Sequence, residues 1–151
     1  MPEYREKLWA PPAPYLATAL IIPASILVFA PISMLAGILI AAGLYAACVA
    51  GLLFSAPVVE LREGELSAGR ARISTDLVGE VQAFEGDEAV LERGRRLDAR
   101  AWLLIRGWIR PVVRIPIVDA TDPAPYWLVS TRHPQKLAAA INGSRRPASS
   151  N

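Results

Sequence analysis

Arginine and tryptophan side chains alternate with apolar ones in one stretch of the sequence, residues 105–118. If this stretch is extended, successive side chains point to opposite faces, so its polar members share one face. Those members are Arg106, Trp108, Arg110 and Arg114. Guanidinium groups beside an indole ring suit an anionic lipid headgroup or an acidic protein surface. The stretch is therefore the predicted contact site for the membrane or for a partner.

A second interpretation of the same arginines involves no ligand. They form a solvated face, or they pair with carboxylates on neighbouring strands, for which the candidates are Glu60, Glu63 and Glu80. A bulge at Gly107 or Pro111 would also break the alternation, because these residues interrupt a regular ladder. The sequence leaves these alternatives open.

Charge is divided unevenly along the rest of the chain. Residues 58–93 contain four arginines and nine acidic residues, a net charge of −5, whereas residues 94–114 contain six arginines and one aspartate, a net charge of +5. A basic segment near an anionic leaflet is attracted to it over a Debye length of about 8 Å. The overall net charge of +2 and the acidic first half argue against an electrostatic footprint for nucleic acid. We therefore expect no nucleic-acid partner.

Residue types that commonly carry catalysis are few. His133 is the single histidine and directly precedes Pro134, which favours a helix-capping or exposed role over a general base. Cys48 lies in an apolar segment, where a thiolate is disfavoured. Tyr126 and Trp127 are typical of sheet packing. Without metal-ligand spacing or a glycine-rich phosphate loop, the sequence predicts a non-enzymatic protein with no metal and no cofactor.

The elements that position these residues begin with a long uncharged segment. Residues 8–59 contain no Asp, Glu, Lys, Arg or His, which fits two membrane crossings of about 20 residues each. Pro31 predicts the turn between the crossings, and Pro23 predicts a kink in the first. We expect a transmembrane two-helix hairpin over residues 13–56, preceded by a cytosolic segment at residues 1–12.

Small side chains recur every four residues in the second crossing. Gly43, Ala47 and Gly51 share one helix face and allow another helix to approach closely. The expected partner of this face is the first crossing, although glycine and alanine are also simply abundant in membrane helices. Neither crossing carries an ionisable residue, which argues against transport of protons or ions.

Positive charges flank both crossings and are absent from the turn between them. Arg5 and Lys7 precede the first, and Arg62, Arg70 and Arg72 follow the second. Because cytoplasmic loops carry an excess of Lys and Arg, both termini are predicted to face the cytoplasm. The expected location is the cell (plasma) membrane, crossed twice, with the lipid bilayer as a partner.

Residues 57–143 show the short alternating segments and turn signals of a small β-domain. The expected strands cover residues 58–62, 70–74, 78–84, 102–118 and 126–131, with a further strand after the turn at residues 63–65. Residues 102–118 form one bent strand or break into two. Residues 86–93 have no clean period and are expected to be a loop or one helical turn. A helix over residues 134–141 closes the domain, and residues 144–151 are predicted to be a disordered tail. The fold class is thus a membrane hairpin plus a small antiparallel β-roll or barrel with a C-terminal helix.

Three motifs of the sequence form a recognisable set. They are Tyr-Arg-Glu-Lys-Leu-Trp at residues 4–9, Gly-Arg-Arg-Leu-Asp with Arg-Ala-Trp within residues 94–102, and Asp-Pro-Ala-Pro-Tyr-Trp-Leu-Val-Ser-Thr-Arg at residues 122–132. Together they resemble an actinobacterial family of small membrane proteins, the domain of unknown function numbered 3093. This resemblance implies two crossings and a cytosolic domain, with no activity or site residues to carry over. The arrangement is also similar to bacterial proteins that place a pleckstrin-homology-like domain after a two-span hairpin, which does not fix function.

Two functional interpretations follow from these features. In the first, the protein is a non-enzymatic adaptor whose cytosolic β-domain meets lipid headgroups or another membrane protein. In the second, it is an accessory subunit of a larger membrane complex, and the small-residue face of the second crossing packs against foreign helices.

Overall fold

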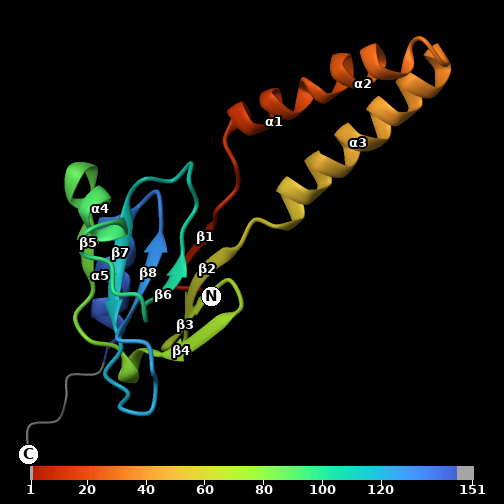
Figure 1. The fold of residues 1–151 in the computed structure, drawn as a ribbon. Coiled ribbons are helices and arrows are strands. Elements are labelled where there is room, and N and C mark those ends of the chain that lie inside the picture. The colour runs from red at the N-terminus through yellow and green to blue at the C-terminus, as the bar shows by residue number, and fades with distance from the viewer. Residues whose placement is uncertain (1, 146–151) are drawn as a thin grey trace, which may run out of the picture. The chain divides into compact units, whose positions relative to one another are not determined.

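The computed structural model describes residues 2–145, which form two compact units. Unit 1 contains residues 2–8 and 57–145, and unit 2 is the segment Trp9–Ala56 that lies between them in the sequence. Figure 1 labels the elements of both units. The chain therefore leaves unit 1 once and returns to it once.

Unit 2 is an α-helical hairpin. Its first arm consists of α1 (Pro12–Ala19) and α2 (Ile21–Phe29), and its second arm is α3 (Met34–Phe54) (Figure 1). The turn lies where Pro31 predicts it, and the side chain of Ser33 caps α3 by accepting a hydrogen bond from the backbone N–H of Ala36 at 3.3 Å. Both arms are long and apolar enough to cross a membrane.

The first arm is interrupted close to Pro23. Leu20 separates α1 from α2, and its N–H bonds the carbonyl of Ala17, three residues back, at 3.2 Å. Proline has no N–H to offer the carbonyl of Ala19, and its ring crowds the preceding turn. The irregularity predicted from Pro23 is therefore present, about one turn before the proline itself.

Sheet 1 of unit 1 is an antiparallel meander in the order β1-β2-β3-β4. Its strands are β1 (Tyr4–Lys7), β2 (Val58–Arg62), β3 (Glu65–Ala68) and β4 (Ala71–Ser74). β1 precedes unit 2 and β2 follows it, yet the two strands pair along their length, with Lys7 opposite Val58. The structure thus differs from the expected separate segment at residues 1–12, because four of those residues complete a sheet of unit 1.

The turn between β2 and β3 has the conformation that its sequence predicts. Glu63 and Gly64 both have positive φ angles, 51° and 77°, which suits a two-residue hairpin turn between twisted strands. β4 leads into a short 3₁₀ helix, η1 (Thr75–Leu77). Of the strand expected over residues 78–84, Gln82–Phe84 forms β5, and Val78 makes an isolated bridge with Ile117.

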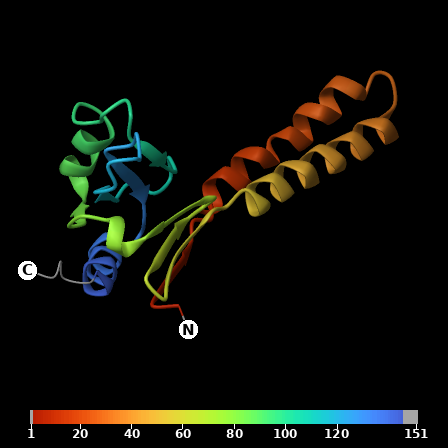
Figure 2. The same cartoon turned by 90° about the horizontal axis from the view of Figure 1, so that it is seen from below.

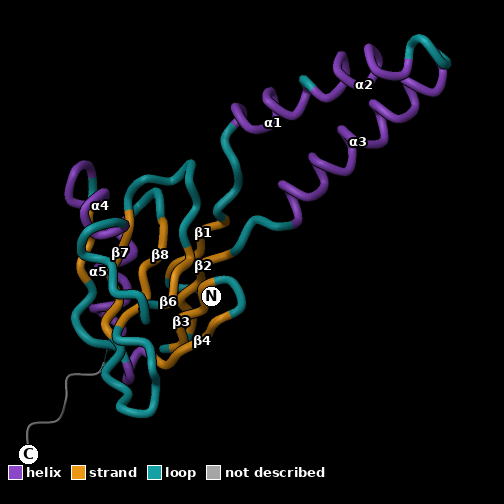
Figure 3. The backbone as a smooth tube through the Cα atoms, viewed as in Figure 1, coloured by secondary structure: helices purple, strands orange, loops and turns teal. Residues whose placement is uncertain are grey.

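Sheet 2 has the strand order β5-β7-β8-β6. Its other members are β6 (Trp102–Leu104), β7 (Val112–Pro116) and β8 (Tyr126–Ser130). The stretch from residue 102 to 118 thus breaks into two strands, one of the predicted alternatives, and Figure 3 shows residues 105–111 between them as a loop. This loop carries the chain past β8 to reach β7. As a result β6 pairs with β8 in parallel, and the prediction of a wholly antiparallel β-roll is wrong at this pair.

The main core of unit 1 lies between the two sheets and α5 (Pro134–Ser144). Leu137 and Ile141 of α5 are fully buried among inward side chains of both sheets, such as Leu66 and Ile115. Figure 2 shows α5, in blue, beside the strands. The predicted C-terminal helix is confirmed and extends to Ser144, so it takes in the first residue of the expected tail. Residues 146–151 of that tail lie outside the described residues.

The outer face of sheet 2 is covered as well. α4 (Gly86–Arg93) packs Ala89 against Val112, Tyr126 and Leu128, although the sequence predicts only a loop or one turn here. Its periodicity is hidden because the buried face includes a carboxylate, Glu92, whereas Val90 is 64% exposed. α4 and α5 therefore lie on opposite faces of sheet 2 (Figure 2).

Candidate functional site

Unit 1 connects to unit 2 at one end, which we call the tether end. The backbone N–H of Leu8, where the chain leaves, donates to the carbonyl of Pro57, where it returns, at 2.9 Å. A methyl group placed on Gly69, in the β3–β4 turn, would lie 3.6 Å from Pro57 Cβ and 3.5 Å from Leu104 Cδ1. The tether end therefore consists of residues 7–8, Pro57, the turn at residues 69–70, the loop at residues 105–111 and residues 130–133.

A buried carboxylate joins the first strand to the segment after the last strand at this end. Glu6 Oε2 accepts hydrogen bonds from the hydroxyls of Tyr4, at 2.7 Å, and Thr131. Its other oxygen, Oε1, accepts from the backbone N–H of Arg132 at 2.9 Å and lies 3.8 Å from the guanidinium of the same residue. The Glu6 side chain is only 9% exposed. Both of its oxygens are occupied by protein donors, so the group works as a structural clamp on β1.

The phenol of Tyr4 completes this cluster as a neutral donor. Burial raises the pKa of Tyr4 well above its usual range, and the neighbouring Glu6 carboxylate adds to that shift, while the hydrogen bond with Thr131 opposes it. Tyr4 is therefore neutral at pH 7, and its hydroxyl donates a hydrogen bond to Glu6. His133, whose backbone N–H donates to Thr131 Oγ1 at 3.1 Å, is the exposed N-cap residue of α5, the role that the sequence favours for it.

The loop at residues 105–111 carries three of the four predicted contact residues. Trp108 is 37% exposed and Arg110 is exposed, whereas Arg106 is half-buried and its backbone N–H donates to Ser130 Oγ at 3.0 Å. Ile109 is buried in the core of unit 1 and fixes the middle of the loop. The structure thus places these three residues together at the tether end, and their contact with a membrane or partner stays a prediction.

Arg114, the fourth predicted contact residue, lies elsewhere. It is on β7 under α4, where its Nη2 lies 3.0 Å from Glu92 Oε2 and its guanidinium carbon lies 4.7 Å from the centre of the Tyr126 ring. The alternation of side chains holds within β7. The face that was expected to be in solvent is covered by α4, a helix that the sequence did not predict. The predicted alternative of pairing to a carboxylate applies to this residue, with Glu92 as the partner in place of Glu60, Glu63 or Glu80.

Glu92 is the residue that sequence reasoning missed. Its side chain is 2% exposed and lies between two guanidinium groups, those of Arg114 and Arg96, the latter at 3.4 Å. The carboxylates of Glu88 and then Glu92 raise the pKa of Arg96. A buried glutamate next to an exposed valine breaks the apolar stripe that reveals most surface helices. No periodicity signal in the sequence could have found it.

The small-residue row of α3 does not meet the first arm. The close approach between the arms is at Gly37, where a methyl group would lie 3.4 Å from Ile26 Cα, whereas methyl groups at Gly43 and Gly51 would meet nothing within 4 Å. The expected packing on the first crossing is therefore wrong at Gly43 and Gly51, and Ala47 between them is exposed. The buried residues of α3 are instead Gly37 and Ala41, and Gly37 faces Ile26 and Phe29 of the first arm. Packing of the row against a helix of another chain stays a prediction.

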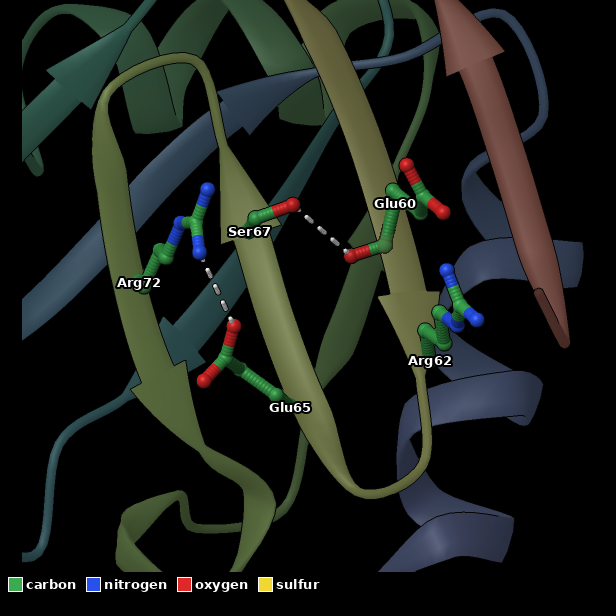
Figure 4. A pocket seen from close by; sticks show the side chains of 5 residues that line it. All are labelled: Glu60, Arg62, Glu65, Ser67 and Arg72. Carbon is green, nitrogen blue, oxygen red and sulfur yellow. Dashed lines mark hydrogen bonds and ion pairs between the residues drawn. The ribbon is translucent and has the colours of Figure 1, made fainter.

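A shallow depression lies on the outer face of sheet 1 and measures about 180 Å³. Its lining residues are Glu60, Arg62, Glu65, Ser67 and Arg72 (Figure 4). The Arg72 guanidinium lies 3.7 Å from the Glu65 carboxylate, and both side chains are more than half exposed. Because charges of both signs alternate there in solvent, the depression favours no ligand of a single charge. Among the described residues, no group of three or more His, Cys, Asp or Glu is placed to bind a metal ion.

The three sequence motifs meet in space, and the motif at residues 122–132 is their common partner. Its Thr131 and Arg132 contact Glu6 of the first motif, as described above. Its Tyr126 hydroxyl accepts a hydrogen bond from the backbone N–H of Asp98 in the second motif at 2.8 Å. Trp127 packs against Trp102, with ring centres 4.8 Å apart. Contacts among the three motifs therefore connect distant parts of unit 1.

Comparison with known proteins agrees with this pattern of motifs. Residues 3–141 match the profile of a family described as "Protein of unknown function (DUF3093)", and the match includes all three motifs. No curated protein and no solved structure matches the chain. The chain belongs to the DUF3093 family.

Proposed function

We propose that this protein is a small integral protein of the cell membrane that anchors a non-enzymatic adaptor domain at the inner surface. Unit 2 crosses the bilayer twice, both termini are cytoplasmic, and unit 1 recognises lipid headgroups or another membrane protein. The observation that carries the proposal is the insertion of an uncharged helical hairpin between two strands that pair with each other. An apolar hairpin of this length suits lipid far better than water.

The pairing of β1 with β2 supports the proposed topology. Because the two strands share backbone hydrogen bonds, the chain enters and leaves unit 2 on the same side of any membrane that unit 2 crosses, which requires an even number of crossings. Arg5 and Lys7 on β1 and Arg62 on β2 give this side its positive charges, as expected for the cytoplasmic side.

The placement of the acidic and basic groups supports the non-enzymatic part of the proposal. Glu6 accepts hydrogen bonds at both of its oxygens, and Glu92 lies between two guanidinium groups, those of Arg96 and Arg114. His133 is exposed at the start of α5 and faces no carboxylate in the described hydrogen bonds. A general base must come within hydrogen-bond reach of its substrate, whereas the side chains of Glu6 and Glu92 are only 9% and 2% exposed.

The pleckstrin-homology-like assignment is part of the same proposal. Two small sheets and a C-terminal helix support it, and the parallel pairing of β6 with β8 is the point at which unit 1 departs from the expected antiparallel roll. The actinobacterial origin that the motifs suggest also stays a prediction.

Labelling of single cysteines in intact cells tests the proposed topology. In a Cys48→Ala background, Ile32→Cys places a thiol in the turn of unit 2, and Thr121→Cys places one in an exposed loop of unit 1. A membrane-impermeant maleimide should label the first variant in intact cells and the second only after lysis. Labelling of Thr121→Cys in intact cells, or recovery of the chain from the aqueous fraction without detergent, would refute the proposal.

A second candidate function, an accessory subunit of a larger membrane complex, is favoured by the open row on α3. Gly43 and Gly51 leave room on their face for a foreign helix to approach closely. Purification in mild detergent should then recover a stoichiometric membrane protein that is lost with Gly43→Leu and retained with Ala42→Leu, an exposed position beside the row. A partner that both variants retain, or a lone chain, would exclude this candidate.

A further inference from the structure

We propose that the tether end of unit 1 docks on an anionic phospholipid leaflet, with Arg70 and Arg110 as headgroup contacts and Trp108 in the interfacial layer. This inference rests on the proposed function and deepens it by naming the partner and the surface that meets it. It differs from the sequence-based prediction, because Arg114 is excluded and Arg70 is added.

The fold gathers at this end positive charges that are far apart in the sequence. They are Lys7 at the end of β1, Arg70 in the β3–β4 turn, Arg106 and Arg110 in the loop, and Arg132 after β8. Arg70 and Arg110 are both exposed, and no carboxylate of the described residues lies within ion-pair distance of either. Glu6, next to this set on β1, is almost buried and lies 3.8 Å from the guanidinium of Arg132. The surface therefore has the charge that an anionic leaflet attracts.

The loop that carries Trp108 is already shaped before any contact with lipid. Ile109 is 2% exposed and anchors it in the core, while the Arg93 guanidinium donates to the carbonyls of Ile109 at 3.5 Å and Arg110 at 3.4 Å. The indole of Trp108 nevertheless remains 37% exposed next to this anchor. Tryptophan is enriched where protein meets the headgroup layer, because its ring is apolar and its N–H is polar. Docking would thus need little ordering of the loop.

Two short connections limit how far this end can move from the bilayer. Residues 8–11 separate β1 from α1, and residues 55–57 separate α3 from β2. Fully extended, these connections reach at most about 18 Å and about 14 Å. With unit 2 in the bilayer, the tether end cannot leave the vicinity of the headgroups, so weak electrostatic attraction is enough to orient it.

An acidic edge sets the direction of that orientation. Glu85 and Asp87 at the start of α4 follow β5, whose Phe84 lies opposite Val112 just after the loop. An anionic leaflet repels this edge and attracts the part formed by β1, the β3–β4 turn and the loop. Unit 1 should therefore tilt so that Arg70 approaches the lipid more closely than α4 does.

Hydrogen–deuterium exchange of the full chain in nanodiscs tests the inference. One sample uses phosphatidylcholine alone, and the other contains about a third phosphatidylglycerol. In the anionic discs, amides of residues 69–70 and 105–111 should exchange about fivefold more slowly, the population change expected from the attraction of one arginine. At 1 M salt, where the Debye length falls to about 3 Å, this difference should vanish. The turn at residues 63–64 should be unchanged.

Paired variants make the test specific to the tether end. Arg70→Gln combined with Arg110→Gln should abolish the lipid-dependent slowing, whereas Arg62→Gln combined with Arg72→Gln removes equal charge from the outer face of sheet 1 and should retain it. Unchanged amide protection in β7 and β8 checks that every variant is folded.

Equal exchange in the two kinds of disc, or slowing that survives in the first pair of variants, would overturn the inference. If that happens while the maleimide pattern is as expected, the proposed function stands with a protein as the partner. If the chain is found outside the membrane, both proposals fail.

Discussion

Unit 1 contains two nearly buried carboxylates that attach a peripheral element to its sheets by different means. Glu6, 9% exposed, joins β1 to the segment after β8 through the hydroxyl of Thr131 and the backbone N–H of Arg132, with a guanidinium at 3.8 Å. It also accepts from the hydroxyl of Tyr4 on its own strand. Glu92, 2% exposed, joins α4 to β7 through the Arg114 guanidinium at 3.0 Å, and the guanidinium of Arg96, just after α4, lies 3.4 Å from it. One clamp is made mainly of neutral donors, and the other is made of charges.

The difference matters because the two clamps leave different groups behind when they are broken. Loss of Glu92 strands a positive charge in a partly buried place, where the cost of an unpaired charge is several kcal/mol. Loss of Glu6 strands a hydroxyl and an N–H, and an unsatisfied neutral donor costs about 1–3 kcal/mol. The ranking of the following substitutions tests this comparison.

The largest effect is expected for Glu92→Leu. The free energy of unfolding should fall by about 3 kcal/mol, because Arg114 remains between α4 and the Tyr126 ring without its counter-charge. Denaturant titration of the full chain in detergent micelles, followed by tryptophan fluorescence, measures this loss.

The matched control removes the positive charge of Arg114 together with the carboxylate of Glu92. Glu92→Leu combined with Arg114→Leu should recover at least half of the lost stability, since Arg96 keeps Glu88 at 2.6 Å. A double variant no more stable than the single one would show that packing, not charge, dominates this clamp.

A smaller loss is expected for Glu6→Ala. The buried hydroxyl of Thr131 and the backbone N–H of Arg132 lose their acceptor, which should cost about 2 kcal/mol. The amides of β1 should then exchange faster than those of β3. Glu3→Ala removes an exposed carboxylate from the same segment and should have little effect, so equal losses in both variants would contradict the proposed clamp.

Tyr4→Phe should cost about 1 kcal/mol near pH 7 and should change the response to alkali. Burial raises the pKa of Tyr4, whereas an unfolded tyrosine ionises near pH 10. The unfolded state therefore loses a proton that the folded state keeps, so this contribution to stability is full below about pH 10 and is lost as the pH rises beyond it. The stability gap between wild type and Tyr4→Phe should narrow from pH 9 to 11. A gap that stays constant would argue against the raised pKa.

The smallest effect is expected for Glu65→Gln on the outer face of sheet 1. Its partner Arg72 lies 3.7 Å away, and both side chains are largely exposed. Water screens such a pair, so the free energy of unfolding should change by less than about 0.5 kcal/mol. A loss as large as that of Glu6→Ala would show that the exposure of a carboxylate does not predict its contribution to the free energy of unfolding.

The sequence by itself determined the elements whose signals are local. The uncharged segment and Pro31 predicted the hairpin of unit 2, and alternating residues with Glu63–Gly64 predicted the β2–β3 turn. Proline and glycine act through the backbone of one or two residues, so their effects can be inferred without knowledge of distant neighbours. The same holds for α5, which begins at Pro134 as its sequence indicates.

Only the tertiary structure decided which distant residues meet. It paired β1 with β2 across the whole of unit 2, covered Arg114 with a helix that contains a buried glutamate, and brought Arg70 to the same end as Arg110. None of these contacts leaves a periodic pattern in the chain, because each depends on groups tens of residues apart. A charge such as that of Arg114 looks exposed in its own strand, and only the element packed over it shows that it is paired.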